Sequence, residues 1–192
     1  LKTQTGASYD LGVKWLKKQY QLYTTLYYMN LNNEIVFDPT RTAAQPFGAN
    51  RNLSPTSRKG INVGAKYIVN PHLTLNGQYS YIDAVFRNGN FKGKRIPFVA
   101  AHAFHLSTLV TITSHWSVFA ESIFTGTRYA AGDDGNVSSA LPEFVIVNSN
   151  ISYHRKRFTI SLRLNNIFNK LYNLLYPAPG RSVMLTADLK LW

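Results

Sequence analysis

The sequence contains no cysteine, so disulfide bonds, thiolate metal sites and thiol nucleophiles are all excluded. It also lacks any run that approaches the roughly 20 consecutive apolar residues of a membrane-spanning helix. Acidic residues are scarce, with nine Asp and Glu against 21 Lys and Arg. These absences argue against a disulfide-stabilised domain and against a helical membrane protein.

No signal peptide is expected within this sequence, because no positively charged start precedes an apolar core and a small-residue cleavage site. The chain begins at Leu1 and not at Met. If the protein is exported, the sequence is therefore expected to be a mature product or a piece of a longer one.

The net charge of +12 would suit nucleic acid, since clustered Lys and Arg neutralise phosphates. The basic residues are instead spread along the chain, mostly in expected turns and loops, with no recognition helix among them. We therefore predict no nucleic-acid partner. Basic loops and turns also suit anionic lipopolysaccharide and lipid headgroups, which are the partners expected if the protein lies in a membrane.

Alternation of apolar and polar residues dominates the sequence and predicts β-strands with one apolar face each. Tyr9, Leu11, Val13 and Trp15, for example, alternate with polar or small residues. About nine segments follow this pattern: residues 9–15, 20–28, 61–69, 73–81, 104–112, 116–124, 145–153, 158–164 and 183–191. Each is close to the 9 to 11 residues with which a tilted strand crosses a bilayer.

The connections between these segments alternate between short and long. Tight turns are expected at residues 17–19, 70–72, 113–115 and 154–157, and long polar loops at about 38–54, 86–96, 126–141 and 170–180. Short turns on one side and long loops on the other are typical of outer-membrane barrels. A soluble β-sandwich has no reason to keep this asymmetry.

Aromatic residues make up 14% of the chain and concentrate towards the ends of the predicted strands. Aromatic side chains favour strands in general, which is one explanation. The other explanation is a pair of interfacial girdles, as in membrane barrels. We favour the girdles because the opposite face of the same strands is polar or small and would make a poor soluble core.

The last part of the chain contains an ordered set of motifs: residues 165–172 (NNIFNKLY), residues 177–181 (PAPGR) and a final alternating strand. This order resembles the carboxy-terminal end of TonB-dependent outer-membrane receptors. Trp192 falls one residue out of phase with the apolar face of Leu189 and Leu191, so the chain is expected to continue beyond it.

The resemblance implies an all-β fold, namely an antiparallel up-and-down transmembrane β-barrel. About nine strands cannot close a plugged transporter of about 22 strands. Residues 1–192 are therefore expected to be the carboxy-terminal portion of the barrel, without the plug domain and the TonB box that the family places ahead of it.

The resemblance also implies a function for the full protein. It would be an active-transport receptor in the outer membrane of a Gram-negative bacterium, importing a scarce nutrient with energy delivered through TonB. A ferric siderophore is the leading cargo, with haem or cobalamin behind it. Two alternatives remain open at this stage: a passive diffusion barrel and a soluble β-rich binding protein.

Ligand-facing candidates are the cations expected in the outer loops or on the inward face, because positive charge attracts anionic ferric chelates. They are Arg51, Arg58, Arg87, Lys94, Arg95, Arg128 and Arg163. The competing explanation for each is a salt-bridged or solvated barrel interior. Arg163 in particular is a candidate for pairing with carboxylates of the plug or wall.

No catalytic, metal or cofactor site is predicted. His102 and His105 are three apart on a strand, so they point to opposite faces, and no Ser or Thr nucleophile has an evident His and carboxylate partner. The Asp133-Asp134-Gly135-Asn136 segment is a turn more readily than a calcium loop, since it lacks regular ligand spacing and a terminal Glu. The protein is not expected to be an enzyme.

Overall fold

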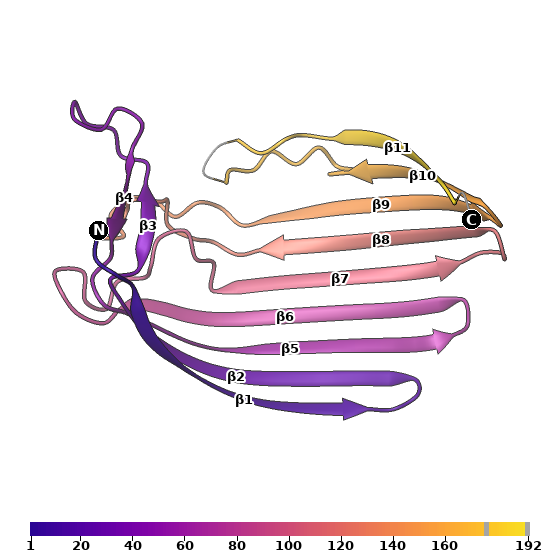
Figure 1. Ribbon diagram of the computed structural model, residues 1–192, viewed down its shortest axis with the longest axis horizontal. Helices are drawn as coiled ribbons and strands as arrows, with labels where there is room; N and C mark the ends of the chain where they lie inside the picture. Colours follow the sequence, from indigo (N-terminus) through magenta and orange to yellow (C-terminus); the bar gives the residue numbers. More distant parts are fainter. Residues whose placement is uncertain (175–176, 191–192) are drawn as a thin grey trace.

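The computed structural model describes residues 1–174 and 177–190, which form one long antiparallel sheet and a small hairpin at one end of it (Figure 1). The strands of the long sheet are β1 (Thr5–Leu16), β2 (Tyr20–Asn32), β5 (Thr56–Asn70), β6 (Leu73–Phe86), β7 (His102–Thr111), β8 (Trp116–Thr125), β9 (Phe144–Arg155), β10 (Phe158–Asn165) and β11 (Ser182–Leu189). No helix of the described residues is long and apolar enough to cross a membrane.

The nine strands are ordered β1-β2-β5-β6-β7-β8-β9-β10-β11, and every neighbouring pair is antiparallel. Each strand of the sheet therefore pairs with the next one along the chain, which is the up-and-down arrangement that the sequence predicts. All nine predicted strands are confirmed. The sheet curves but does not close, so β1 and β11 form its two edges (Figure 1).

The alternation of short and long connections is confirmed as well. At one end β1 and β2, β5 and β6, β7 and β8, and β9 and β10 are joined by turns of two to four residues. At the other end the connections span residues 33–55, 87–101, 126–143 and 166–181. We refer to these as the turn end and the loop end; in Figure 1 they lie at the right and the left.

The hairpin of β3 (Ile35–Asp38) and β4 (Ala49–Asn52) was not predicted, since β3 lies between the predicted strand 20–28 and the predicted loop at about 38–54, and β4 lies inside that loop. Each of these strands has four residues, which is too short for an alternating pattern to stand out. The hairpin forms a separate two-stranded sheet at the loop end.

The outward face of the long sheet is apolar and exposed. Leu11 is 70% exposed and Leu185 is 71% exposed, near opposite edges of the sheet. Exposure of many large apolar side chains to water costs about 25 cal/mol for each Å². This cost vanishes in hydrocarbon, so the face suits lipid.

Aromatic clusters lie on the outward face near the turn end. Trp15 lies 6.1 Å from Tyr20, and Tyr20 lies 5.6 Å from Tyr67, measured between ring centroids. Farther along the sheet, Tyr153 contacts Trp116 at 4.9 Å and Phe158 at 6.0 Å. Aromatic side chains at one level of neighbouring strands support the predicted interfacial girdle.

The inward face is polar, and large side chains lie flat against it where a neighbouring strand has glycine. A Cβ built on Gly64 would lie 1.9 Å from a ring carbon of Tyr23, and one built on Gly60 would lie 2.5 Å from the hydroxyl of Tyr27. Tyr23 and Gly64 are direct partners in the β2–β5 register, as are Tyr27 and Gly60. The glycines therefore make room for the tyrosine rings.

The buried apolar core sits at the loop end. Leu53, Ala84, Phe86 and Ile96 form it, with parts of the β3–β4 hairpin and of loop 87–101 packed against it. This core packs the hairpin and loop 87–101 against β5 and β6 at the loop end. Leu191, the last residue of the predicted final strand, and Trp192 lie outside the described residues, so the phase of Trp192 stays a prediction.

Candidate ligand-binding site at the loop end

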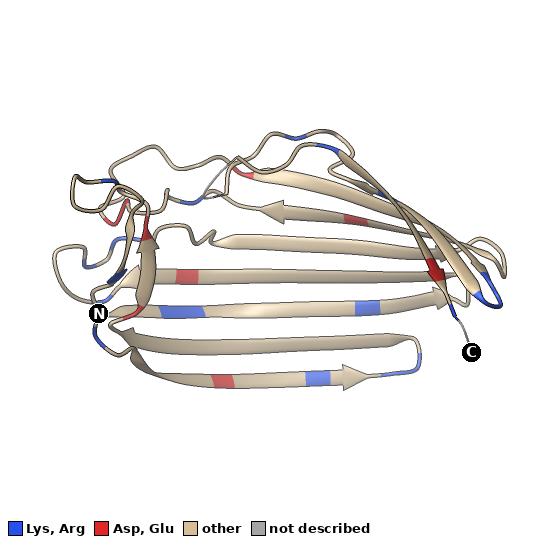
Figure 2. Ribbon diagram, turned by 45° about the horizontal axis from the view of Figure 1, so that its top comes forward, with Lys and Arg blue, Asp and Glu red and all other residues tan. Residues whose placement is uncertain are grey.

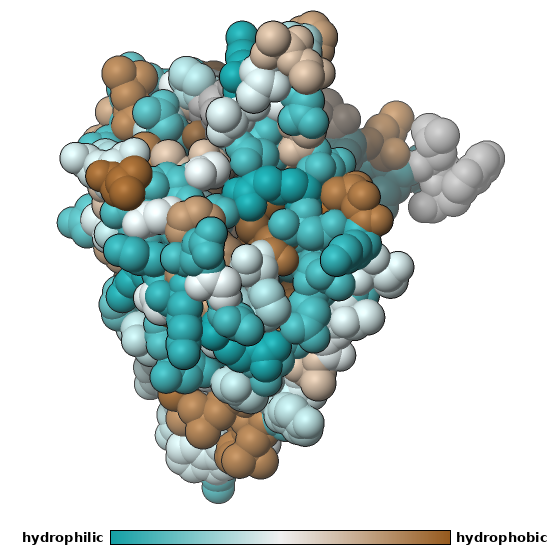
Figure 3. Space-filling view, turned by 90° about the vertical axis from the view of Figure 1, so that its left-hand side faces the viewer, coloured by the Kyte–Doolittle hydropathy of each residue, from teal (hydrophilic) through white to brown (hydrophobic). Residues whose placement is uncertain are grey.

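Three long loops meet at the loop end and present a mostly hydrophilic surface with a few separate apolar side chains (Figure 3). Charged and amide side chains join loops 33–55, 87–101 and 126–143 to one another. The geometry of these contacts shows which of the predicted cations form ion pairs or hydrogen bonds within the fold.

Arg51 on β4 is held by two carboxylates. Its Nε donates to Asp38 at 2.6 Å, and its two terminal nitrogens donate to the two oxygens of Asp134 at 2.8 Å. The hydrogen bond to Asp134 is the main cause of a raised pKa of Arg51. Burial by itself would raise the pKa of Asp38, but hydrogen bonds from Thr40 and Arg51 outweigh it and hold this pKa below its ordinary value.

Arg58 on β5 is likewise engaged with an acidic residue. One terminal nitrogen donates to Glu34 at 2.6 Å, and the other donates to the hydroxyl of Thr56 at 3.3 Å. The hydroxyl of Thr56 in turn donates to Glu34 at 3.1 Å. Glu34 begins the hairpin loop, so this triad ties the loop to the end of β5.

Asn136 joins loop 126–143 to loop 87–101 through the backbone of Arg95. Its side-chain oxygen accepts from the N–H of Arg95 at 2.7 Å, and its side-chain nitrogen donates to the carbonyl of Arg95 at 2.9 Å. Beside it, Asp133 accepts from the N–H groups of Val137 and Ser138 at 2.9 and 3.0 Å. These hydrogen bonds, of which the one from Val137 has the largest effect, lower the pKa of Asp133. They are typical of a turn, as the sequence predicts.

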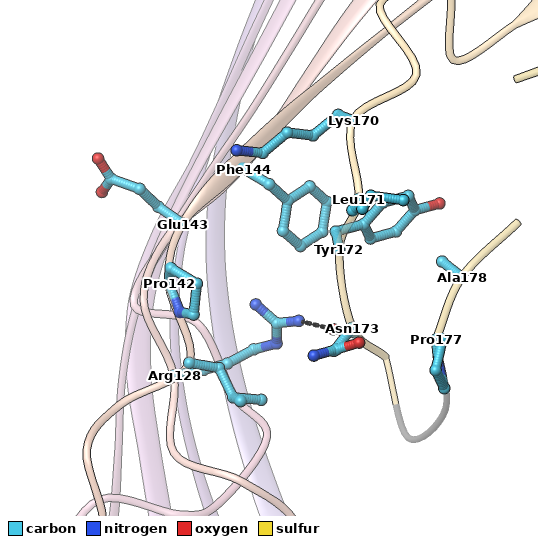
Figure 4. A pocket seen from close by; sticks show the side chains of 11 residues that line it. Arg128, Pro142, Glu143, Phe144, Lys170, Leu171, Tyr172, Asn173, Pro177 and Ala178 are labelled. Atoms are coloured by element: carbon cyan, nitrogen blue, oxygen red, sulfur yellow. Dashed lines mark hydrogen bonds between the residues drawn. The ribbon is translucent and has the colours of Figure 1, made fainter. Parts of the chain in front are cut away.

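Arg128 has the most unusual environment of the seven cations, because it is 5% exposed and no carboxylate pairs with it within the described residues. Its guanidinium carbon lies 5.4 Å from the ring centre of Phe98 and 5.2 Å from that of Phe144. One terminal nitrogen donates to the backbone carbonyl of Asn173 (Figure 4). Burial lowers the pKa of Arg128.

A cavity of about 370 Å³ lies beside Arg128, between the approach to β9 and loop 166–181. Phe144 and Tyr172 form an aromatic wall, with ring centres 4.5 Å apart. Figure 4 shows the guanidinium of Arg128 on the same side as these rings, whereas the carboxylate of Glu143 points away from them. The cavity therefore combines a buried cation with aromatic surface, which suits a planar anionic group.

The four remaining predicted cations are exposed and form fewer contacts within the fold. Arg87 donates to the side chain of Asn32 at 3.0 Å, and the exposed Arg163 donates to Asn165 at 2.9 Å. Lys94 and Arg95 are exposed, and no ion pair to either side chain occurs within the described ranges. Four of the seven are therefore both exposed and without a salt bridge within the described residues: Arg87, Lys94, Arg95 and Arg163.

The inward face below the loops holds a second polar group. His105 contacts Glu121 at 3.0 Å, and Asn148 donates to the other oxygen of Glu121 at 2.9 Å. A concavity of about 390 Å³ runs from Glu121 to Arg163 across β8, β9, β10 and β11. His102 lies on the outward face, where Tyr79 contacts it at 2.8 Å, so the predicted opposite orientation of His102 and His105 is confirmed.

Across residues 1–174 and 177–190, no group of three His, Asp or Glu side chains is arranged to hold a metal ion. The loop end therefore offers cations, amides and aromatic rings, and its carboxylates are largely occupied by arginine or by backbone N–H groups.

Residues 1–167 match the family model described as TonB dependent receptor-like, beta-barrel. The chain belongs to the TonB-dependent receptor family. The match covers most of the chain, and the long sheet is the carboxy-terminal part of the family's β-barrel. It ends before residues 177–181, one of the motifs that carry the sequence resemblance, so two largely separate parts of the chain point to the same family.

Solved structures of TonB-dependent receptors share this fold at low sequence identity. The ferric-catecholate import receptor Fiu from Escherichia coli K12 is 20% identical, with a TM-score of 0.72 over 98% of this chain and 28% of its own. The ferric yersiniabactin uptake receptor FyuA from Yersinia pestis is 18% identical, with a TM-score of 0.78 over 98% and 30%. The copper transporter OprC is 16% identical, with a TM-score of 0.78 over 98% and 31%.

The chain thus spans about a third or less of the length of these receptors. The seven cations proposed from sequence were chosen for their charge and for their expected place in the outer loops or on the inward face. Their partners could not be identified in that way, because Asp38 and Asp134 are 13 and 83 residues from Arg51. Phe98, Phe144 and Asn173 around Arg128 were missed for the same reason.

Proposed function

We propose that this chain is the carboxy-terminal barrel segment of an outer-membrane receptor that imports an anionic metal chelate by TonB-dependent active transport. A ferric siderophore is the leading cargo class, ahead of haem and cobalamin. The plug domain and the segment that contacts TonB would belong to the remainder of the protein. The receptor would act in the outer membrane of a Gram-negative bacterium as a transporter and not as an enzyme.

Membership of the TonB-dependent receptor family supports the proposal of TonB-dependent transport, and the similar solved structures support a metal-related cargo. Two of the similar structures are named as receptors for ferric chelates and one as a copper transporter. Because all three are 20% identical or less, they share the fold with this chain and do not identify its cargo.

The observation that carries the proposal of an anionic cargo is the imbalance of charge at the loop end. Lys94 and Arg95 project from loop 87–101 without an ion pair in the described part of the chain, and Arg128 is buried beside a cavity without a carboxylate partner. Anions are attracted to a surface where cations exceed their internal partners. An anionic chelate fits this arrangement better than a neutral or cationic one.

The test is uptake of radioactive ferric chelates by iron-limited cells that carry or lack the full-length gene. Uptake of at least one ferric siderophore should be lost in the deletion strain, restored by the gene, and lost again when TonB is removed. Uptake that continues without TonB would indicate a passive barrel. Recovery of the protein in the soluble fraction without detergent would indicate a soluble binding protein.

The cations can be tested in the same assay. Replacement of Lys94 and Arg95 by Gln should weaken binding of an anionic chelate by about fivefold to thirtyfold, since each lost charge contact is worth roughly 0.5–1 kcal/mol at an exposed site. The double variant Arg41→Gln/Arg181→Gln removes the same charge from two exposed cations of the other long loops and serves as the control. Equal losses in both variants would show that net charge, and not this loop, attracts the cargo.

A further inference from the structure

Positive charge at the turn end of the sheet has almost no negative charge beside it. Six exposed cations lie in or next to the short turns: Lys17, Lys18, Arg155, Lys156, Arg157 and Lys190. All nine acidic residues of the chain fall within the described ranges, and Asp188, the register partner of Thr159, alone lies next to these turns. Figure 2 shows the blue segments of Lys and Arg at this end. None of the six cations forms an ion pair within the described residues.

The loop end differs because it contains several acidic residues that form ion pairs. Its acidic residues Glu34, Asp38 and Asp134 are matched to Arg58 and Arg51 at 2.6 to 2.8 Å. Much of the acidic charge there is thus neutralised inside the fold, although Lys94 and Arg95 have no ion pair within the described residues. At the turn end the charge is left exposed, so it is available to a partner outside the chain.

The largest group of these cations lies directly beyond the aromatic girdle. Arg155 is the register partner of Phe158 and follows Tyr153 by two residues, so all three side chains belong to the outward face. Trp116, Tyr153 and Phe158 form the aromatic cluster at this level. Aromatic belts mark the boundary between hydrocarbon and headgroups, which places Arg155 at the depth of the headgroups.

Two further contacts bring the other cations of this group to the same point. Lys156 and Arg157 complete the turn between β9 and β10, and the N–H of Lys190 donates to the carbonyl of Arg157 at 2.8 Å. The end of β11 is thereby held beside the turn. Four cations from two adjacent segments converge there: Arg155, Lys156, Arg157 and Lys190.

The first hairpin repeats the arrangement. Trp15, Tyr20 and Tyr67 form the aromatic cluster at the corresponding level, and Lys17 and Lys18 make the turn beyond it. The N–H of Lys17 donates to the carbonyl of Tyr20 at 2.8 Å, which fixes the turn against the cluster. Cations next to an aromatic cluster thus occur near both edges of the sheet, in each case at the turn end.

We propose that the turn end of this barrel segment is a binding surface for anionic phospholipid headgroups, centred on Arg155, Lys156, Arg157 and Lys190. Short turns face the periplasm in outer-membrane barrels, so the lipids concerned are those of the inner leaflet. Arginine side chains donate paired hydrogen bonds to phosphate oxygens, and lysine adds a compact charge. An acidic protein segment fits less well, because Arg155 lies on the lipid-facing side of the strand and not on the inward face.

This surface is separate from nutrient import, and the proposal depends only on insertion of the barrel into a membrane. It predicts that the full-length receptor retains anionic lipid in preference to zwitterionic lipid. Each cation near a lipid surface contributes about fivefold to the binding constant, which corresponds to about 1 kcal/mol.

The experiment is native mass spectrometry of the full-length receptor in detergent, titrated with phosphatidylglycerol or with phosphatidylcholine. The wild-type protein should retain phosphatidylglycerol in preference to phosphatidylcholine. The triple variant Arg155→Gln/Lys156→Gln/Arg157→Gln should lose on the order of a hundredfold in phosphatidylglycerol binding, because about fivefold is lost for each of the three charges. Binding of phosphatidylcholine should not change.

Two further variants make the result decisive. The triple variant Arg41→Gln/Lys92→Gln/Arg181→Gln removes the same charge from the loop end and should leave phosphatidylglycerol binding unchanged. The charge-conserving variant Arg155→Lys/Arg157→Lys should retain most of the binding, which shows that the turn tolerates substitution. Unchanged lipid binding in the turn variant, or an equal loss in the loop-end variant, would overturn the proposal.

Discussion

Arg51 and Asp134 form a two-pronged ion pair with both N–O distances at 2.8 Å, although 83 residues separate them in the sequence. Asp134 is 6% exposed, and its partner also binds Asp38 at 2.6 Å. This relationship fastens loop 126–143 to the β3–β4 hairpin. A segment expected to be an open loop is thereby a fixed part of the loop end.

Replacement of Asp134 by Asn should loosen the β3–β4 hairpin. Loss of a charged hydrogen bond that leaves Arg51 partly unpaired costs about 1.5–3 kcal/mol. Hydrogen exchange of the amides in β3 and β4 of the full-length receptor should therefore accelerate by about tenfold to a hundredfold. Asp10→Asn, at an exposed carboxylate on β1, is the control and should not change it. Equal protection in both variants would show that the apolar core alone holds the hairpin.

The same hairpin should depend on pH through Asp38. Its pKa in the fold lies below the ordinary value of 3.8, so the ionised carboxylate stabilises the hairpin at every pH above 3.8. This stabilisation is lost as the pH falls below 3.8 and through the lowered pKa. Hydrogen exchange of β3 and β4, corrected for intrinsic rates, should show the loss as the pH is lowered below about 4. Asp38→Asn should lower protection at neutral pH and flatten this part of the profile.

Arg128 should matter for the position of loop 166–181. Arg128→Ala removes the contacts with Phe98 and Phe144 and the hydrogen bond to Asn173, with an expected cost of about 2–4 kcal/mol. Arg128→Met keeps much of the apolar contact and should cost less, since the charge has no carboxylate partner to leave exposed. Exchange of amides 170–174 in the full-length receptor measures both effects. Identical losses in the two variants would assign the whole effect to the hydrogen bond.

Gly64 should tolerate no side chain, whereas Gly77 should tolerate a small one. A Cβ at Gly64 would lie 1.9 Å from the ring of Tyr23, but one at Gly77 meets only a flexible carbon of Leu106 at 3.3 Å. We expect Gly64→Ala to destabilise the barrel by about 1–3 kcal/mol and Gly77→Ala by less than about 1 kcal/mol. The temperature at which the full-length barrel unfolds on heating in SDS gels gives the comparison.

A double variant checks the cause assigned to Gly64. If the clash with the ring is responsible, Tyr23→Ala/Gly64→Ala should be clearly less unstable than the sum of its two single variants. Additive losses would mean that the cost arises from the backbone of β5 itself.

Much of the fold was predictable because its signals are local. Leu11 and Trp15 mark the apolar face of β1 by a period of two, and Lys17 and Lys18 mark the turn that follows. Since side chains of a strand alternate strictly between faces, such a pattern determines both the strand and the side that meets lipid. Short turns then pair the two strands of each of four hairpins, whereas the pairing of neighbouring hairpins across the long loops is given by the structure.

The candidate site was only partly predictable. Charge and position in a loop pointed to Arg51 and Arg128 alike, yet the first is neutralised by Asp38 and Asp134, while the second lies between two phenylalanine rings. Nothing near either residue in the sequence separates the two cases.

The sequence by itself determined the nine strands of the long sheet, their lipid-facing side, the turn end and the family. Only the tertiary structure decided which cations are bound within the fold, because ion pairs and burial depend on residues that long loops bring together from distant parts of the chain. Strand periodicity is a property of neighbours in sequence, whereas the pairing of Arg51 with Asp134 is a property of neighbours in space.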